Sequence, residues 1–372
     1  MNGYFDHNAT TPLSRVAREA YLEASDRFWH NPSSLYRDGA AARRALEDSR
    51  VELAEMLCTE PKRVVFNSGA TEGSNAIFQH CSGSAAAISA IEHPCVTDAA
   101  EAVTQVTVIP CSETGVTDPA AIPKESAIVS VMAANNENGV IQPWREALEF
   151  CDEHGIPFHC DASQWLGKLP SRGLGKCGYL SGTAHKFGGP KGTGFLLVPE
   201  DHMAMRSLRG GPQENDHRAG TENYPAIASM IAALDHSQSR SGDPSPRDAF
   251  EQRVLELIPG TRVAGAGTER LWNTSMLILP EHKNLKWLTR LSARGISVST
   301  GSACSAGRDN PSRVLLAMGY TYDDMSRALR ISSGHETSPA DWRALALALG
   351  ETYEELAGGK NSALGKISLT DL

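Results

Sequence analysis

Apolar and polar positions follow two kinds of pattern along most of the chain. From about residue 14 to about residue 229, stretches with apolar side chains at helical spacing alternate with short runs rich in Val, Ile, Ala and Phe. This alternation is typical of a mostly parallel β-sheet covered by helices. The predicted strands are residues 64–67, 86–91, 106–110, 128–132, 156–160 and 193–198, and the predicted helices between them include residues 40–57, 71–80 and 145–153.

A second unit is predicted after residue 236. The run Ser-Gln-Ser-Arg-Ser-Gly-Asp-Pro-Ser-Pro at 237–246 concentrates turn-forming residues and interrupts the periodicity. Beyond it, helices are predicted near 248–258, 285–294 and 339–356, and strands near 275–279 and 296–299. This mixture indicates a smaller α+β domain. The tail, 358–372, lacks an apolar face, and we expect it to be mobile or bound to a partner.

Composition narrows the class of protein. The chain has 372 residues, 41% of them hydrophobic, and a formal net charge of −9, values typical of a soluble globular protein. The acidic balance argues against nucleic acid as a partner. No apolar run approaches the ~20 residues that span a bilayer, and the N-terminal residues do not resemble a signal peptide. We therefore expect no membrane association.

The eight cysteines are scattered and form no C-x-x-C pair. This spacing supports neither a disulfide framework nor a zinc site, so we predict no metal ligands and a reducing, cytoplasmic setting.

Two segments point to a ligand site at the carboxyl ends of strands. The run Asn67-Ser-Gly-Ala-Thr-Glu-Gly73 follows a strand and opens a helix, so its N–H groups could hold a phosphate, although a simple tight turn explains it as well. Asp161 ends an apolar strand, where it could hold a ring nitrogen protonated or cap a turn.

Three further side chains are candidates for chemistry. Lys186 lies between a strand near residues 179–181 and a glycine-rich turn, where a sheltered amine could form a Schiff base or simply snorkel to the surface. Cys304 lies in a run of small residues that leaves its thiol accessible, whereas the other cysteines lie in apolar or helical contexts. Arg330 lies in an apolar, strand-like context and needs an anion, either a substrate carboxylate or an Asp or Glu of the protein.

Taken in order, a set of motifs resembles the cysteine desulfurases, which are pyridoxal-phosphate enzymes of the class V aminotransferase group. The resemblance extends from about residue 5 to about residue 350. The motifs are Phe5-Asp-His-Asn-Ala-Thr-Thr-Pro12, Ser68-Gly-Ala-Thr-Glu72, Glu92-His93, Asn135-Asn-Glu-Asn-Gly139, Asp161-Ala-Ser-Gln164, His185-Lys186, Arg218-Ala-Gly-Thr221, Gly301-Ser-Ala-Cys304 and Arg330-Ile-Ser332. The Ser-Ala-Cys run is similar to that of the nitrogen-fixation and general iron–sulfur cluster desulfurases.

The resemblance implies a fold and a division into domains. The implied fold is that of the type I pyridoxal-phosphate transferases, an α/β fold with a mostly parallel seven-stranded sheet and a smaller α+β domain. Residues 14–236 would form the large domain, and residues 1–13 with 237–357 the small domain that includes the cysteine loop.

The resemblance also implies a role for each matching residue. Lys186 would be the Schiff-base lysine, Asp161 the partner of the pyridinium nitrogen, and Cys304 the sulfur-accepting nucleophile. His93 would stack on the ring and is a candidate base for the thiol. Contacts on the phosphate side are implied for Ala70, Thr71, Thr183 and His185, and contacts on the side of the phenolic oxygen for Asn136 and Gln164. Asn136 would also contact the substrate, and Arg330 would bind the substrate carboxylate. Thr221 would reach the phosphate in the site of the neighbouring subunit.

The implied activity is the removal of sulfur from L-cysteine, giving L-alanine and a persulfide on Cys304. The persulfide would pass to a sulfur-acceptor protein for iron–sulfur clusters, thio-cofactors or tRNA thiolation, and could contact a cluster transiently. The role of Thr221 implies a homodimer. Two alternatives stay open: a selenocysteine lyase or another class V enzyme such as a transaminase, and an inactive scaffold that recruits sulfur-transfer partners. The Asp161, Lys186, Cys304 and Arg330 set disfavours the scaffold.

Overall fold

The structure is a computed structural model that describes residues 3–202, 204–300 and 311–358. Its largest element is a seven-stranded sheet with the order β1-β7-β6-β5-β4-β2-β3. The strands are β1 (Val64–Asn67), β2 (Ala85–Ser89), β3 (Gln105–Ile109), β4 (Ile128–Ser130), β5 (Phe158–Asp161), β6 (Tyr179–Thr183) and β7 (Gly194–Leu197). Strands β2 to β6 are parallel, and β7 is antiparallel to both of its neighbours, β6 and β1. The predicted mostly parallel sheet is therefore confirmed.

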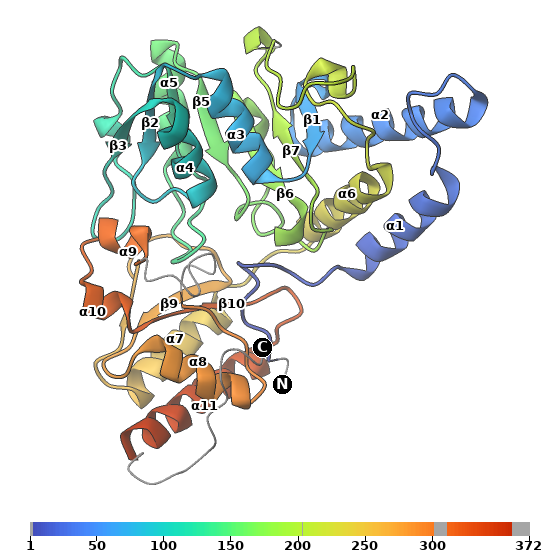
Figure 1. Ribbon diagram of the computed structural model, residues 1–372. Helices are drawn as coiled ribbons and strands as arrows, with labels where there is room; N and C mark the ends of the chain where they lie inside the picture. Colours follow the sequence, from blue (N-terminus) through green and yellow to red (C-terminus); the bar gives the residue numbers. More distant parts are fainter. Residues whose placement is uncertain (1–2, 203, 301–310, 359–372) are drawn as a thin grey trace.

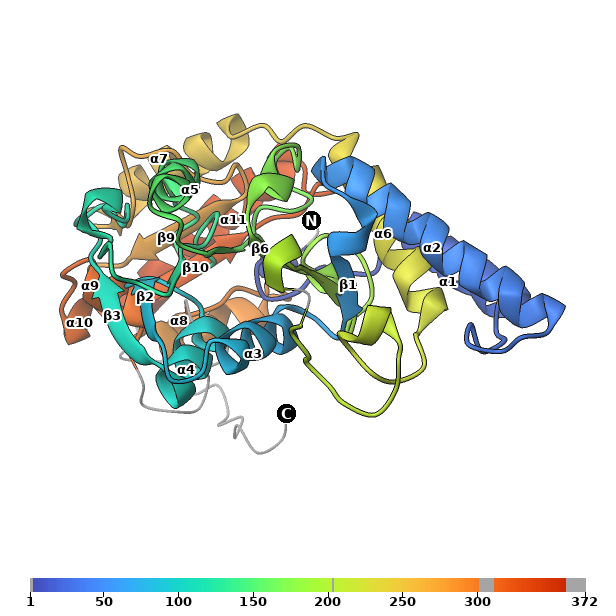
Figure 2. The ribbon, with the colours of Figure 1, turned by 90° about the horizontal axis from the view of Figure 1, so that it is seen from above.

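Helices cover both faces of this sheet (Figure 1). They are α1 (Arg15–Arg27), α2 (Arg37–Leu57), α3 (Ala70–His80), α4 (Pro94–Val103), α5 (Trp144–His154) and α6 (Tyr224–Gln238). Because side chains alternate along a strand, Leu196 packs with Ile77 of α3 on one face, whereas Leu197 lies in the cluster that contains Leu53 of α2 on the other. Figure 2 shows α1, α2 and α6 grouped beside β1.

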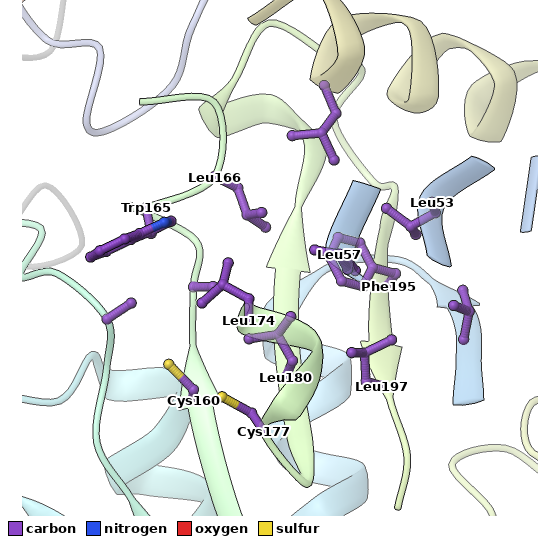
Figure 3. Close-up of a cluster of buried hydrophobic side chains, with 14 of the residues drawn as sticks. Leu53, Leu57, Cys160, Trp165, Leu166, Leu174, Cys177, Leu180, Phe195 and Leu197 are labelled. Carbon is purple, nitrogen blue, oxygen red and sulfur yellow. The ribbon is translucent and has the colours of Figure 1, made fainter. Parts of the chain in front are cut away.

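A cluster of buried apolar side chains packs against β5, β6 and β7, the strands nearest the candidate site (Figure 3). In it, Leu57 of α2 and Phe195 of β7 lie close together, and Cys160 of β5 and Leu180 of β6 are fully buried. Cys160 immediately precedes Asp161. Close packing of this kind restricts rotamers, so the strand ends offer fixed positions for polar side chains.

The second unit is built on a three-stranded antiparallel sheet in the order β10-β9-β8. Its elements are α7 (Ser245–Leu257), β8 (Arg262–Val263), β9 (Thr274–Ile278), α8 (Asn284–Ala293), α9 (Arg313–Ala317), α10 (Tyr322–Met325), β10 (Ala328–Ser332) and α11 (Pro339–Gly358). Phe250 of α7, Trp287 of α8 and Trp342 of α11 share its core. The domain bounds stay a prediction; the expected boundary after residue 236 falls in the last turn of α6.

The N-terminal segment connects the two sheets. Phe5 lies in the core of the second unit, with its ring centroid 5.4 Å from that of Trp342, and its N–H donates to Ser297 O at 2.8 Å. A few residues later, Thr11 N donates to His185 O at 2.8 Å, beside the end of β6. The chain between these anchors, which contains Asn8, therefore passes along the junction of the two units.

The remaining predicted helices and strands match the structure apart from shifts at their ends, with one exception. The predicted strand at 296–299 is wrong, because this stretch forms only isolated bridges, from Ser297 to Tyr4 and from Ser299 to Arg330. Each bridge pairs a single residue, which is too little for a strand. Within the described ranges, no helix has the length and apolar character needed to cross a membrane.

Candidate active site

A cavity of about 530 Å³ opens where β5 and β6 end, next to the N-terminus of α3. Its volume lies within the range of small-molecule sites. The lining residues are Ala9, Thr10, Ser68, Gly69, Ala70, Thr71, Glu72, His93, Cys95, Met132, Ala134, Asn136, Asp161, Ser163, Gln164, Thr183, His185, Lys186, Lys191 and Gly192. The structure thus brings together the predicted residues Ala70, Thr71, His93, Asn136, Asp161, Gln164, Thr183, His185 and Lys186.

Lys186 ends the short 3-10 helix η4 (Ala184–Lys186), which follows β6 directly. Its Nζ donates to Asn8 O at 2.6 Å and to Ala9 O at 2.9 Å. Both acceptors belong to the N-terminal segment, so the segment fixes the amine at the cavity wall. The preceding residue is held in the same way, because Thr11 Oγ1 donates to His185 O at 2.7 Å.

Asp161 and His93 both line the cavity: Asp161 is the last residue of β5, and His93 lies between β2 and α4. The Asp161 side chain is buried, and its Oδ1 accepts from Ser163 N at 2.9 Å. His93 caps α4, with Nδ1 accepting from Cys95 N at 3.1 Å. Burial lowers the pKa of His93, and Asp161 opposes this shift. Since Nδ1 is an acceptor, the neutral ring carries its proton on Nε2 and is a donor there.

The N-terminus of α3 provides a cradle for an anion. Gly69 precedes the helix with φ 135°, and the N–H groups of the first turn have no acceptor within the helix. The backbone approaches closely here, since a Cβ on Gly194 would lie 2.6 Å from Gly69 Cα. The Thr183 hydroxyl group is also close to Gly69: its Oγ1 lies 3.0 Å from the position that a Cβ on Gly69 would occupy. Backbone donors, the helix dipole and a hydroxyl group are the usual partners of a phosphate.

Two predicted residues lie elsewhere in the described part of the chain. Arg330 is buried in β10 and absent from the cavity lining; its guanidinium donates to Asp6 Oδ1 at 2.8 Å and to Asn136 O at 3.2 Å. The carboxylate partner that the sequence left open is therefore present. Thr221 is exposed and lines a separate cavity of about 80 Å³. Cys304 lies outside the described residues.

Sequence reasoning missed several contributors. The backbone carbonyls of Asn8 and Ala9 hold Lys186, although only their motif had been noted. The Ser163 hydroxyl is buried at the cavity wall, with no hydrogen-bond partner among the described residues. Its place between Asp161 and Gln164 was the available signal, whereas nothing local singled out Cys95, which lines the same cavity.

Comparisons with known proteins agree with this geometry. The class-V aminotransferase family matches residues 3–345. A cysteine desulfurase from Klebsiella pneumoniae is 36% identical over 350 residues, covering 90% of this chain and 88% of the relative. The solved structure of a NifS-like protein from Rickettsia africae ESF-5 has a TM-score of 0.85 at 27% identity, covering 95% of this chain and 100% of that one. Another, of SspA in complex with cysteine, has a TM-score of 0.77 at 27% identity, covering 89% and 98%. The chain therefore belongs to the class-V aminotransferases and, within them, to the cysteine desulfurases.

Proposed function

We propose that the chain is a pyridoxal-phosphate-dependent cysteine desulfurase that converts L-cysteine to L-alanine and leaves a persulfide on Cys304. The observation that carries the proposal is the meeting of the Lys186 amine, the Asp161 carboxylate and the α3 N-terminus around one cavity. Class-V aminotransferases and cysteine desulfurases are pyridoxal-phosphate enzymes. The similarity to cysteine desulfurases and to SspA, whose structure is of a complex with cysteine, supports the same substrate.

The residues present fit this cofactor. Gly69 lines the cavity at the N-terminus of α3, and the phosphate would be bound there by the free N–H groups of the helix and by Thr71, Thr183 and His185. Asp161 would hold a proton on the ring nitrogen. The orphaned Ser163 hydroxyl and the side chains of Asn136 and Gln164 supply further polar contacts, the latter two on the side of the ring oxygen.

When bound, the cofactor supplies an electron sink that makes the substrate's Cα proton acidic. The residues of this chain then have distinct tasks. Lys186 would remove that proton, and the carbonyls of Asn8 and Ala9 keep its Nζ in place. His93 would stack on the ring and offer an N–H from Nε2. Arg330 would bind the substrate carboxylate while keeping Asp6, because a guanidinium has five donors.

The sulfur step is assigned to Cys304. Its thiolate would attack the sulfur of the substrate, so that a sulfur–sulfur bond forms as the carbon–sulfur bond breaks and the carbon takes up a proton. The added sulfur remains on the enzyme until an acceptor protein takes it. We place this exchange in the cytoplasm, in keeping with the scattered cysteines.

The holoenzyme incubated with L-cysteine and a thiol reductant should produce alanine and sulfide in equal amounts. Absence of both products from cofactor-loaded protein would contradict the proposal and favour a scaffold. A protein that turns over L-selenocysteine but not L-cysteine would be a selenocysteine lyase. Alanine formed only when an oxo acid is supplied would identify a transaminase.

We also propose a homodimer in which Thr221 serves the site of the other subunit. Thr221 is exposed and does not line its own chain's larger cavity. Large apolar side chains on α1 and on the turn to α2 are exposed as well, namely Leu22, Trp29, Leu35 and Tyr36, with Leu35 94% exposed. Such a group on one surface is typical of a buried interface between subunits.

Mixing two inactive variants should restore activity if the sites are shared. A Lys186→Ala chain paired with a Thr221→Asp chain has one site with both lesions and one with neither. After random subunit exchange, about a quarter of the parental activity should return, because about half of the dimers are mixed and each has one intact site. Alanine production is the measurement. Activity that stays at the sum of the two homodimers, after exchange has been verified by mass spectrometry, would show that Thr221 acts within its own chain.

A further inference from the structure

Lys168 is a buried lysine for which the proposed reaction has no task. It lies in the turn after β5, is 7% exposed, and its Nζ donates to Gln164 Oε1 through a short hydrogen bond. Burial lowers the pKa of Lys168 well below its ordinary value, and the nearby cations Lys186 and Arg330 act in the same direction. A buried amine is costly, so its partner indicates what it does.

That partner connects Lys168 to the candidate catalytic lysine. Gln164 Nε2 donates to Asn8 O at 3.0 Å, and the same carbonyl accepts from Lys186 Nζ at 2.6 Å. The chain of contacts therefore runs from Lys168 through Gln164 and the Asn8 carbonyl to Lys186. In this series of contacts, Gln164 Oε1 and Asn8 O both accept hydrogen bonds from nitrogen donors.

The two partners together fix which way the Gln164 amide points. A carbonyl can only accept, so Asn8 O requires the amide nitrogen, and the Lys168 amine donates to the amide oxygen. Gln164 also lines the cavity. Its Nε2 has a second hydrogen, which Asn8 O does not use. A rotation that exchanges the amide oxygen and nitrogen would break the hydrogen bonds to both Lys168 and Asn8 O. Without Lys168, only the hydrogen bond to Asn8 O would oppose this rotation.

We propose that Lys168 is a positioning residue of this site, which holds the Gln164 amide so that an N–H, and not a carbonyl oxygen, is offered to the ring oxygen of the bound cofactor. The inference rests on the proposed function. It assigns to Lys168 a hydrogen-bonding task that does not require a charge. The cations Lys186 and Arg330 face Lys168, as do His7 and His335, and burial lowers the pKa of both histidines.

Binding of pyridoxal phosphate to the apoprotein tests the proposal. Lys168→Met keeps an unbranched side chain and removes the donor, so it should weaken binding about tenfold, the usual order for a buried polar group left without its partner. The pH midpoint of the visible spectral change of the bound cofactor should rise, because an N–H donated to the ring oxygen stabilises its negative charge. Trp272→Phe is the matched control: it removes a 3.1 Å hydrogen bond to the backbone carbonyl of the same lysine and should leave both readouts unchanged.

The double variant separates positioning from a direct effect of charge. If Lys168 acts through Gln164, adding Lys168→Met to Gln164→Leu should change the affinity for pyridoxal phosphate by less than about twofold relative to Gln164→Leu alone. The pH midpoint of the spectral change should then stay where Gln164→Leu alone puts it. Additive effects, or a Lys168→Met protein with parental affinity and midpoint, would overturn the proposal. Parental protein that does not bind pyridoxal phosphate would instead overturn the proposed function.

Gln164→Glu keeps the test informative if Lys168→Met does not fold. Lys168 remains in this variant and gains a carboxylate partner, but the side chain at position 164 has no N–H to offer. Cofactor affinity should fall and the midpoint should rise, as in Lys168→Met. Parental values in a folded Gln164→Glu protein would show that the orientation of this amide does not matter.

Discussion

Replacing Lys186 with alanine should abolish covalent attachment of pyridoxal phosphate and lower desulfurase activity by at least about 10³-fold, because one side chain supplies both the covalent link and the proton transfer. The fold should persist, since the variant removes the side-chain hydrogen bonds to Asn8 O and Ala9 O at the cavity wall and leaves the buried apolar clusters intact. Visible absorbance after gel filtration, with circular dichroism of the same sample, measures both expectations.

Two other lysines make this test specific. Lys191 lines the same cavity, and Lys168 lies one glutamine away from the carbonyl that binds Lys186. Borohydride reduction of the parental holoenzyme followed by peptide mass spectrometry should find the cofactor on Lys186. A label on Lys168 or Lys191, or reducible colour that survives in Lys186→Ala, would contradict the assignment.

The predicted residues that line the cavity lie next to regular elements. Asp161 ends β5, Lys186 follows β6 within one short helix, and Thr71 opens α3. Parallel strands bring their carboxyl ends to one edge, so a local pattern is enough to predict that such side chains meet. Apolar runs of strand length, bounded by turn residues, are enough to predict the strands whose ends form this edge.

Other parts of the site depend on contacts between distant segments. The carbonyls that hold Lys186 are about 180 residues away in sequence, and the partner of Arg330 is Asp6. Every residue has a backbone carbonyl, so a sequence pattern does not predict which carbonyls bind a side chain. The pattern also does not distinguish a buried lysine such as Lys168 from an exposed lysine in a turn. The strand expected at 296–299 failed for a related reason: the stretch pairs through one residue with Tyr4 and through one residue with Arg330 of β10, which is too little pairing for a strand.

The described cysteines strengthen the choice of Cys304 by their surroundings. Cys95 lines the cavity, but burial raises the pKa of its thiol, as it also does for Cys81, Cys111 and Cys151. A buried thiol with a raised pKa is a poor nucleophile, because the thiolate is the attacking form. His93 stays a candidate base for the thiol; because its Nδ1 accepts from Cys95 N, its neutral ring carries the proton on Nε2.

Cys304→Ala should bind pyridoxal phosphate and L-cysteine as the parental enzyme does, yet transfer no sulfur. The substitution removes the nucleophile and leaves Lys186, Asp161 and Arg330 in place. The parental rate should rise with pH, because the thiolate is the attacking form and a free cysteine, with a pKa of ~8.5, is mostly protonated at neutral pH. Spectral titration with L-cysteine reports binding, and alanine and sulfide report turnover.

Mass spectrometry after brief exposure of the parental enzyme to L-cysteine should find one additional sulfur on the peptide that contains Cys304. Cys81→Ala, which removes a half-buried thiol at the end of α3, is the control and should retain the label and full turnover. An added sulfur on Cys95 in place of Cys304 would move the nucleophile to the cavity wall. Parental turnover in Cys304→Ala would show that the persulfide mechanism is wrong even where the cofactor binds as proposed, because Cys95, the described cysteine that lines the cavity, has a thiol whose pKa burial raises.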